Sequence, residues 1–326
     1  METPTLYIGI DVSSTHLDLV PFDKKTTHIP NTTAGINALI KRLNALKQPL
    51  FLCCESTGGY EQKLLDAMFD AHITIARVNP ERVRHLAKSD GHFAKTDPLD
   101  AALITRFAQQ KKPAPYRRPS PEILRLKALA NRRTQLIDFK TQDNNRLQQT
   151  SDPELRTLIR KHLKFLNTQI AALDKALAQL IQSTPRLRAL HDRLSPVIGF
   201  GPVTLHGLLA HLPELGAYTD KQLTALVGLA PWARDSGASK GKRSLHGGRP
   251  HVRKLLYMPA LNAVRRNPLL RAFYQRLLQR GAPKKSALVA VMRKLLCLAN
   301  RLLADPDFKL TPSPSPAKAS LKHPPA

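Results

Sequence analysis

The chain has 326 residues and carries 51 lysines and arginines against 24 aspartates and glutamates, a formal net charge of +27. At about 150 residues per domain this length predicts two or three domains, and a hydrophobic content of 42% excludes global disorder. No apolar stretch approaches the roughly 20 residues of a transmembrane helix, and residues 1–7 carry no secretory signal. Cys53, Cys54 and Cys297 fit neither a disulfide framework nor zinc-ligand spacing, so we expect a reduced, cytoplasmic protein.

The positive charge is unevenly distributed along the chain. Residues 1–110 hold 12 lysines and arginines and 12 aspartates and glutamates, whereas residues 236–304 hold 16 lysines and arginines and no acid. Such a segment repels itself unless a polyanion neutralises it, so nucleic acid is the expected partner. A membrane surface is not expected, because no amphipathic anchor or lipidation signal accompanies the charge.

Residues 1–110 alternate between strand and helix patterns. Hydrophobic patterning and turn residues predict strands over 6–12, 17–22, 25–29, 50–54 and 73–78 and helices over 33–46, 60–71 and 98–109. This order indicates an α/β domain with a mixed sheet. Four prolines within residues 111–121 then predict a linker or an extended strap.

The middle region, residues 111–190, is predicted to be helical, with helices over 122–149 and 155–181. The second helix has apolar residues alternating at spacings of four and three, which is a coiled-coil seam: Ile159, Leu163, Leu166, Ile170, Leu173, Leu177 and Leu180. Two interpretations stay open, namely packing against the helix over 122–149 and self-association into a homodimer that pairs into a tetramer.

Residues 191–310 are predicted to form a mostly helical C-terminal domain. A glycine-rich turn at 197–201 precedes an apolar helix that extends to Leu212, and further helices are expected over 223–229, 252–263, 269–278 and 286–303. The turn suits either a phosphate-binding hairpin or a plain helix–helix corner. Residues 232–251 are predicted to be a basic loop, and the proline-rich tail 311–326 to be disordered.

Four carboxylates are candidates for a metal site in the first domain. Asp11 and Glu55 stand where two predicted strands end, and Asp97 and Asp100 lie three apart at the start of a helix. Together they would repel one another unless a divalent cation neutralised them, and Mg²⁺ uses such carboxylates in phosphoryl transfer. Taken singly, each also suits a structural role, as Asp97 does as a helix cap before Pro98.

Several segments resemble one protein family. YIGIDVSSTHLDL (7–19), CCESTGGYEQKLLDAMFDAHI (53–73) and VNPERVRHLAKSDGHFAKTDPLDAALI (78–104) resemble the DEDD-type insertion-sequence transposases, and LTALVGLAPWARDSGASKGKRSLHGGRPHVRKLLYMPAL (223–261) resembles their C-terminal transposase domain. The order and spacing of these segments make the resemblance specific. One departure is Ile198, which begins the hairpin Ile198-Gly199-Phe200-Gly201 where the family commonly has a proline.

The resemblance implies a ribonuclease-H-like, RuvC-type N-terminal domain whose four acids are Asp11, Glu55, Asp97 and Asp100. It also implies a catalytic serine, Ser236, in a Ser-Gly motif, with Ser239 as a rival. It further implies a transposase that cuts and rejoins donor and target DNA through a phosphoserine, with Mg²⁺ and a structured bridge RNA as guide, in the nucleoid of a prokaryote. Nearby cations are expected to contact nucleic acid: Arg234, Lys240, Lys242, Arg243, Arg249, Arg253 and Lys254.

Three alternatives come from other classes of protein. A RuvC-like, metal-dependent junction nuclease would need the acids but no serine intermediate. A small-molecule kinase of the actin-like superfamily is suggested by GIDVSST (9–15), but the chain lacks a second nucleotide-binding half. A non-catalytic RNA-binding protein with a decayed nuclease fold is the third, and the presence of all four acids argues against it.

Overall fold

The computed structural model describes residues 4–20, 27–89, 97–232, 244–245 and 247–310. They form two compact units, Met1–Pro119 (unit 1) and Ser120–Ala326 (unit 2). Within the described residues, no helix is long and apolar enough to cross a membrane.

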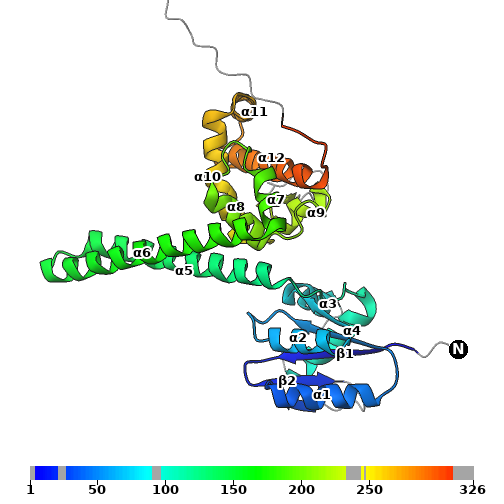
Figure 1. The fold of residues 1–326 in the computed structure, drawn as a ribbon. Coiled ribbons are helices and arrows are strands. Elements are labelled where there is room, and N and C mark those ends of the chain that lie inside the picture. Colours follow the sequence, from blue (N-terminus) through cyan, green and yellow to red (C-terminus); the bar gives the residue numbers. More distant parts are fainter. Residues whose placement is uncertain (1–3, 21–26, 90–96, 233–243, 246, 311–326) are drawn as a thin grey trace, which may run out of the picture. The chain divides into compact units, whose positions relative to one another are not determined.

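A five-stranded mixed sheet forms the centre of unit 1 (Figure 1). Its order is β3-β2-β1-β4-β5, in which β1–β2 and β2–β3 are antiparallel while β1–β4 and β4–β5 are parallel. The strands are β1 (Leu6–Val12), β2 (His16–Val20), β3 (Thr27–Pro30), β4 (Leu50–Glu55) and β5 (Ile75–Val78). This confirms the predicted mixed α/β domain.

The two faces of this sheet are covered by different helices. On one face, β-branched and leucine side chains of β1, β2 and β4 pack with α1 (Thr33–Ala45) and α2 (Gln62–Asp70). On the other face, Cys53, Ala76 and Val78 pack with α3 (Pro80–Ser89) and α4 (Asp97–Lys111). The sequence analysis did not predict α3. Its pattern is short and charged, and it begins where Asn79 Oδ1 accepts the Glu81 N–H at 2.8 Å.

The proline-rich segment after α4 is an extended strap of unit 1. The Tyr116 N–H donates to the Ile75 carbonyl at 2.7 Å, which adds a backbone contact at β5. Arg118 donates to both carboxylate oxygens of Asp70, at 2.7 and 2.8 Å, and to Asp66. These bonds explain why the segment is part of unit 1 although it has no regular secondary structure.

Unit 2 consists of a long helical hairpin and a helical bundle (Figure 1). The hairpin pairs α5 (Pro121–Gln149) with α6 (Pro153–Ser183). Leu166 and Ile170 of the predicted seam are buried against Leu136 of α5, and Leu177 lies in the main core of the unit. The interpretation of packing within the chain is therefore confirmed for these seam residues.

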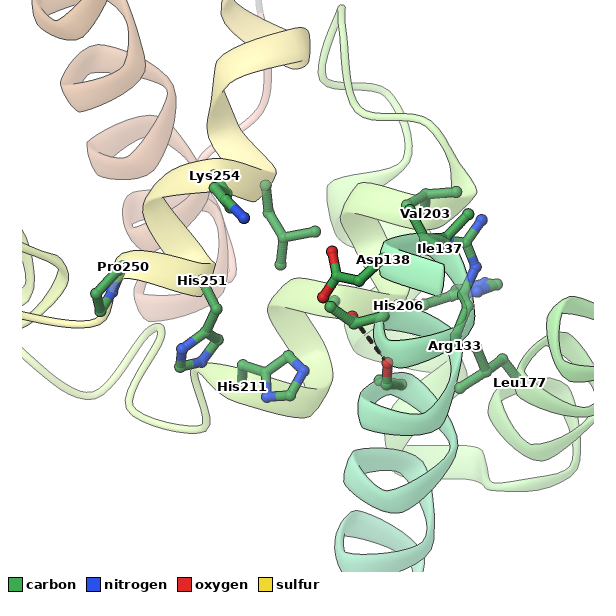
Figure 2. A pocket seen from close by; sticks show the side chains of 14 residues that line it. Arg133, Ile137, Asp138, Leu177, Val203, His206, His211, Pro250, His251 and Lys254 are labelled. Carbon is green, nitrogen blue, oxygen red and sulfur yellow. Dashed lines mark hydrogen bonds between the residues drawn. The ribbon is translucent and has the colours of Figure 1, made fainter. Parts of the chain in front are cut away.

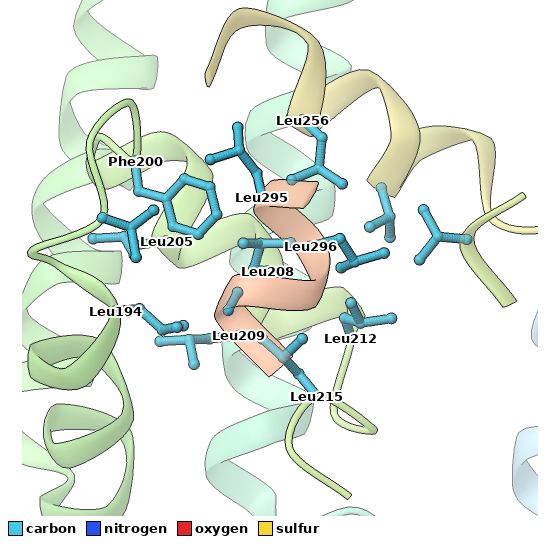
Figure 3. Packing of buried hydrophobic residues seen from close by; sticks show 14 of the residues in the cluster. Leu194, Phe200, Leu205, Leu208, Leu209, Leu212, Leu215, Leu256, Leu295 and Leu296 are labelled. Atoms are coloured by element: carbon cyan, nitrogen blue, oxygen red, sulfur yellow. The ribbon is translucent and has the colours of Figure 1, made fainter. Parts of the chain in front are cut away.

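The bundle packs around α12 (Lys284–Ala304), whose buried face includes Leu295 and Leu296 (Figure 3). Its polar Asn300 is buried and bonded on both sides, accepting from the Gly216 N–H at 2.8 Å and donating to the Tyr218 carbonyl at 2.9 Å. The remaining helices are α7 (Pro185–Leu194), α8 (Pro202–His211), α9 (Asp220–Val227), α10 (Pro250–Arg266) and α11 (Pro268–Gln279). α7 was not predicted. The predicted loop over 232–251 includes the short strands β6 (Pro231–Trp232) and β7 (Ser244–Leu245).

Candidate active site and nucleic-acid interface

Asp11 and Glu55 stand at the same end of two neighbouring parallel strands. The register pairs Gly9 with Cys53 and Ile10 with Cys54, and its continuation sets Asp11 beside Glu55. Alternate residues of a strand share a face, so both acids lie on the face of Gly9 and Cys53. Each is partly exposed, as expected at a sheet edge that solvent reaches. The strand ends thus bring together two of the predicted carboxylates.

Gly9 positions α4 against this face. Its N–H donates to Thr105 Oγ1 at 2.7 Å, and a Cβ at position 9 would lie 2.2 Å from the Ala101 carbonyl oxygen. Asp100 directly precedes Ala101, and Asp11 is two residues beyond Gly9 along β1. The close approach therefore packs α4 on the sheet face that carries Asp11, and we expect Asp100 and the helix start at Asp97 to lie near the same edge.

The donor set at this edge is made of carboxylate oxygens, which suit a hard divalent cation such as Mg²⁺. Glu55 also acts on its neighbour: burial, with the Glu55 charge added, raises the pKa of the Cys53 thiol to about 12. Among the described side chains, which exclude that of Asp97, no three histidine, cysteine, aspartate or glutamate residues form a ready metal site. The four-carboxylate metal site therefore stays a prediction that the backbone placement favours.

A further acid, Asp18, extends the row of polar residues across the sheet. The register pairs Asp11 with Asp18 and Asp18 with His28, so Glu55, Asp11, Asp18 and His28 follow one another over four strands. Asp18 is only 2% exposed, and its carboxylate bonds with His28 and lies 3.2 Å from His16 Nε2. The sequence analysis missed this residue, because the register that sets it beside Asp11 was not known from the sequence.

Glu61 is a second acid that the sequence analysis missed, and it organises the loop after Glu55. It is 2% exposed and accepts hydrogen bonds from the Gly59 N–H at 2.9 Å and the Thr57 N–H at 3.2 Å. Burial raises its pKa, but these hydrogen bonds outweigh burial and leave the pKa of Glu61 below its ordinary value. An ionised Glu61 therefore fixes the turn that follows the β4 carboxylate.

The Ser-Gly motif lies outside the described residues. The residues concerned are Ser236 and its rival Ser239, together with the nearby cations Arg234, Lys240, Lys242 and Arg243. The residues on either side are described, and β6 pairs antiparallel with β7 through Pro231–Leu245 and Trp232–Ser244. Residues 232 and 244 are therefore neighbours. The roles of the serines and of these cations stay predictions.

Three other predicted nucleic-acid contacts differ in their surroundings. Arg249 donates two hydrogen bonds to Glu214, at 2.6 and 2.7 Å, and one to the His211 carbonyl. Arg253 donates to the Gly247 carbonyl at 2.9 Å. Lys254 is exposed and, within the described part of the chain, has no hydrogen bond or ion pair. Both arginines thus have structural bonds, whereas the Lys254 ammonium group is available to a ligand.

The glycine-rich turn connects α7 to α8. Gly199 has φ 103°, and a Cβ there would lie 2.5 Å from the carbonyl oxygen of Pro259 in α10. Glycine is therefore required for close packing between the turn and α10. This contact supports the interpretation as a helix–helix corner, and a phosphate contact at the turn stays a prediction.

Exposed cations are concentrated on α10, α11 and α12. We refer to the exposed cations of these helices and of the α11 C-cap as the basic surface: Lys254, Arg265, Arg266, Arg271, Arg276, Arg280, Lys284, Lys285, Arg293, Lys294 and Arg301. Lys294 and Arg276 also lie over the Phe273 ring, at 4.5 and 5.6 Å from its centroid. An exposed surface of this composition attracts a phosphate backbone without reading sequence.

Comparison with known proteins places these features in one class. Residues 8–153 match the IS110-type DEDD transposase family, and residues 191–275 match the family described as transposase IS116/IS110/IS902. The chain belongs to this family of transposases, enzymes of DNA transposition and recombination. The match favours the transposase interpretation over the small-molecule kinase.

Among individual relatives, the pilin gene-inverting proteins of Moraxella lacunata and Moraxella bovis are each 30% identical over 307 residues, covering 90% of this chain and 94% of theirs. The insertion element IS110 uncharacterized 43.6 kDa protein of Streptomyces coelicolor is 26% identical over 152 residues, which covers 45% of this chain and 36% of its own.

Proposed function

We propose that the chain cuts and rejoins DNA strands through a covalent serine–phosphate intermediate, with a divalent cation at the carboxylates of unit 1. The observation that supports this most is the register that sets Asp11 beside Glu55, with α4 packed on their face through Gly9, inside the segment that matches a transposase family. Asp97 and Asp100 stand in the first turn of that helix.

The chemistry assigns separate tasks to the two units. Mg²⁺ held by Asp11, Glu55, Asp97 and Asp100 would neutralise charge on the scissile phosphate. The Ser236 hydroxyl attacks phosphorus, so that an Oγ–P bond forms while the P–O bond to the leaving strand breaks. The serine proton passes to a general base, and the leaving oxygen takes up a proton. A DNA hydroxyl then attacks the serine phosphate, which restores the backbone and frees Ser236.

A structured RNA that pairs with donor and target DNA is part of the proposal, and it rests on the family resemblance. In such a system base pairing reads the sequence, while the protein contacts backbone and shape. The basic surface of α10–α12 supports this division, because its cations suit phosphates rather than base edges. Arg234, Lys240, Lys242, Arg243 and Lys254 are proposed to contact the polynucleotide near Ser236.

Assembly into a homodimer that pairs into a tetramer is also proposed, because two DNA sites must exchange strands. The seam residues Leu166 and Ile170 pack within the chain, so they are unsuitable for a test. Leu158 and Phe165 of α6 are 59% and 57% exposed and offer an apolar surface to a second copy. Replacing both with glutamate should reduce the mass measured by light scattering and leave the fold of unit 1 intact.

A covalent adduct tests the serine mechanism. We expect a denaturing gel of the reaction to show the chain attached to a cleaved strand, with the adduct lost in Ser236→Ala and kept in the matched control Ser239→Ala. Rejoining then needs no ATP, since the serine ester conserves the energy of the broken bond. Normal cleavage and rejoining by Ser236→Ala would contradict the serine mechanism, whereas hydrolytic cleavage without an adduct would favour the second candidate, a metal-dependent junction nuclease, which the four acids alone would support.

A further inference from the structure

A cavity of about 590 Å³ opens between α5, α8 and α10 of unit 2 (Figure 2). This volume lies within the roughly 300–1,000 Å³ of sites for small organic ligands. All of its lining residues belong to unit 2, and the sequence analysis assigned a ligand-binding role only to Lys254 among them. The carboxylate site does not account for the cavity, so its chemistry requires a separate explanation.

Two histidine rings form one side of the cavity. His211 is the last residue of α8 and His251 the second residue of α10, and their ring centroids lie 4.7 Å apart at an interplanar angle of 75°. Burial, followed by the charges of His251, Lys127 and Arg249, lowers the pKa of His211 to about 4. Both rings are therefore neutral near pH 7, because burial and nearby cations also lower the pKa of His251. Neutral imidazoles can stack on a base and exchange hydrogen bonds with its edge.

The remaining walls combine apolar and charged groups. Ile137, Leu177 and Leu255 supply apolar surface, whereas Asp138 and Lys254 supply one exposed charge of each sign. Arg133 also lines the cavity, but its guanidinium is already bonded to Asp174, at 2.5 and 3.3 Å. A bare phosphate ion would leave the apolar walls without a partner. A ligand with a flat, heteroatom-edged ring and an attached phosphate matches all of these groups.

We propose that this cavity binds one unpaired nucleotide of a polynucleotide, with the base against the His211–His251 pair and the phosphate at Lys254. The proposal rests on the proposed function, because a nucleic-acid enzyme supplies such a ligand. It adds a base-binding site to a surface that otherwise contacts only phosphates. Removing a base from its stack costs a few kcal/mol, so the cavity would favour nucleotides of the polynucleotide that are already unpaired.

Titration of the full chain, labelled with ¹⁵N histidine, by adenosine 5′-monophosphate tests the site directly. We expect saturable shifts of the His211 and His251 ring signals, which His211→Gln and His251→Gln assign. Inorganic phosphate and ribose 5-phosphate, which lack the base, should leave these signals in place. Absence of the shifts with adenosine monophosphate, or equal shifts with phosphate alone, would overturn the proposal.

Matched variants separate the cavity from the general attraction of the basic surface. Lys254→Ala should lower the affinity for adenosine monophosphate about tenfold, since a hydrogen bond to a charged group is lost. Lys285→Ala removes the same charge from an exposed position of α12 and should change this affinity less than about twofold. Equal effects of the two variants would contradict a site at Lys254.

Two further measurements distinguish an RNA ligand from a DNA ligand, and a failure of the cavity proposal from a failure of the proposed function. If deoxyadenosine monophosphate binds with the same affinity as the ribonucleotide, the cavity accepts either DNA or RNA. If the ribonucleotide binds more tightly, the cavity is assigned to RNA. Both results support a nucleotide site. The adduct assay at Ser236 is run in parallel. A normal adduct together with no nucleotide binding would reject the cavity proposal and leave the proposed function standing.

Discussion

The N-terminal and C-terminal regions of the chain differ in their balance of acidic and basic residues. Residues 1–110 balance 12 basic against 12 acidic residues and place several acids at one sheet edge, whereas residues 236–304 carry 16 basic residues and no acid. Carboxylates surrounded by excess lysine and arginine would form ion pairs with them and would no longer be available to bind a metal ion. A basic surface interspersed with acids would bind phosphate weakly. Because the two kinds of charge are separated along the chain, the carboxylates can bind a metal ion and the lysine and arginine side chains can bind a polyanion.

The carboxylate edge of unit 1 and the cavity of unit 2 also differ in how closely backbone approaches their glycines. In unit 1, Gly9 lies against the backbone of α4, where a Cβ would be 2.2 Å from the Ala101 oxygen and 2.4 Å from the Thr105 nitrogen. In unit 2, a Cβ at Gly207 would meet the side chain of Leu255, which can rotate away. The carboxylate edge therefore depends on a fixed helix–sheet distance, whereas the wall of the cavity tolerates small changes.

The largest expected effect on stability follows from this contact. Gly9→Ala should destabilise unit 1 by about 3 kcal/mol, because backbone atoms must move to admit the new Cβ. Denaturant unfolding monitored separately for the two units should show the loss in unit 1 alone. Gly201→Ala is the control, since its Cβ would meet no atom within 4 Å. Unchanged stability of Gly9→Ala would refute the close approach of α4.

A smaller effect is expected from pH, and it falls on unit 2. The folded unit holds the pKa of His211 at about 4 against an ordinary 6.5, so the unfolded chain binds more protons between these values. The contribution of His211 to stability is complete above pH 6.5 and declines as the pH falls toward 4. Thermal unfolding at pH 7.5 and pH 5 should show a larger loss for the natural chain than for His211→Gln. Equal losses would contradict the burial of His211.

The smallest effects are expected from single cations of the basic surface. Arg266→Gln and Arg280→Gln should each reduce the slope of log affinity against log salt for duplex DNA by about 0.9 if each neutralises one phosphate. Lys41→Gln, at an exposed position of α1 outside the basic surface, should leave the slope unchanged. Equal slopes for all three variants would place the DNA contact elsewhere.

The sequence predicted the parts of the fold that depend on periodicity. All five strands and the helices around them in unit 1, apart from α3, follow alternation or helical spacing, and the strap followed from its prolines. α3 and α7 were missed because short charged helices have weak periodicity. The seam of α6 was found, but a single pattern of apolar residues cannot distinguish a partner helix in the same chain from one in another.

The site was predictable only in part, for a physical reason. Asp11 and Glu55 are visible because strands end there, Asp97 and Asp100 because they lie three apart at a predicted helix start, and the resemblance added Ser236. Asp18 and Glu61 became visible only when the register and the loop hydrogen bonds were known. The paired rings of His211 and His251 come from helices 40 residues apart in the chain, and no local pattern links them.

The most direct test of the central claim is a change of metal preference at Asp11. Asp11→Cys replaces a hard oxygen ligand with a soft thiolate, so cleavage should fall at least 100-fold with Mg²⁺ and recover in part with Mn²⁺. Asp11→Asn should stay inactive with both metals, and Glu81→Gln, an exposed acid of α3, should behave as the natural chain. Full activity of Asp11→Cys with Mg²⁺, or cleavage by the natural chain in EDTA, would contradict a metal site at these carboxylates.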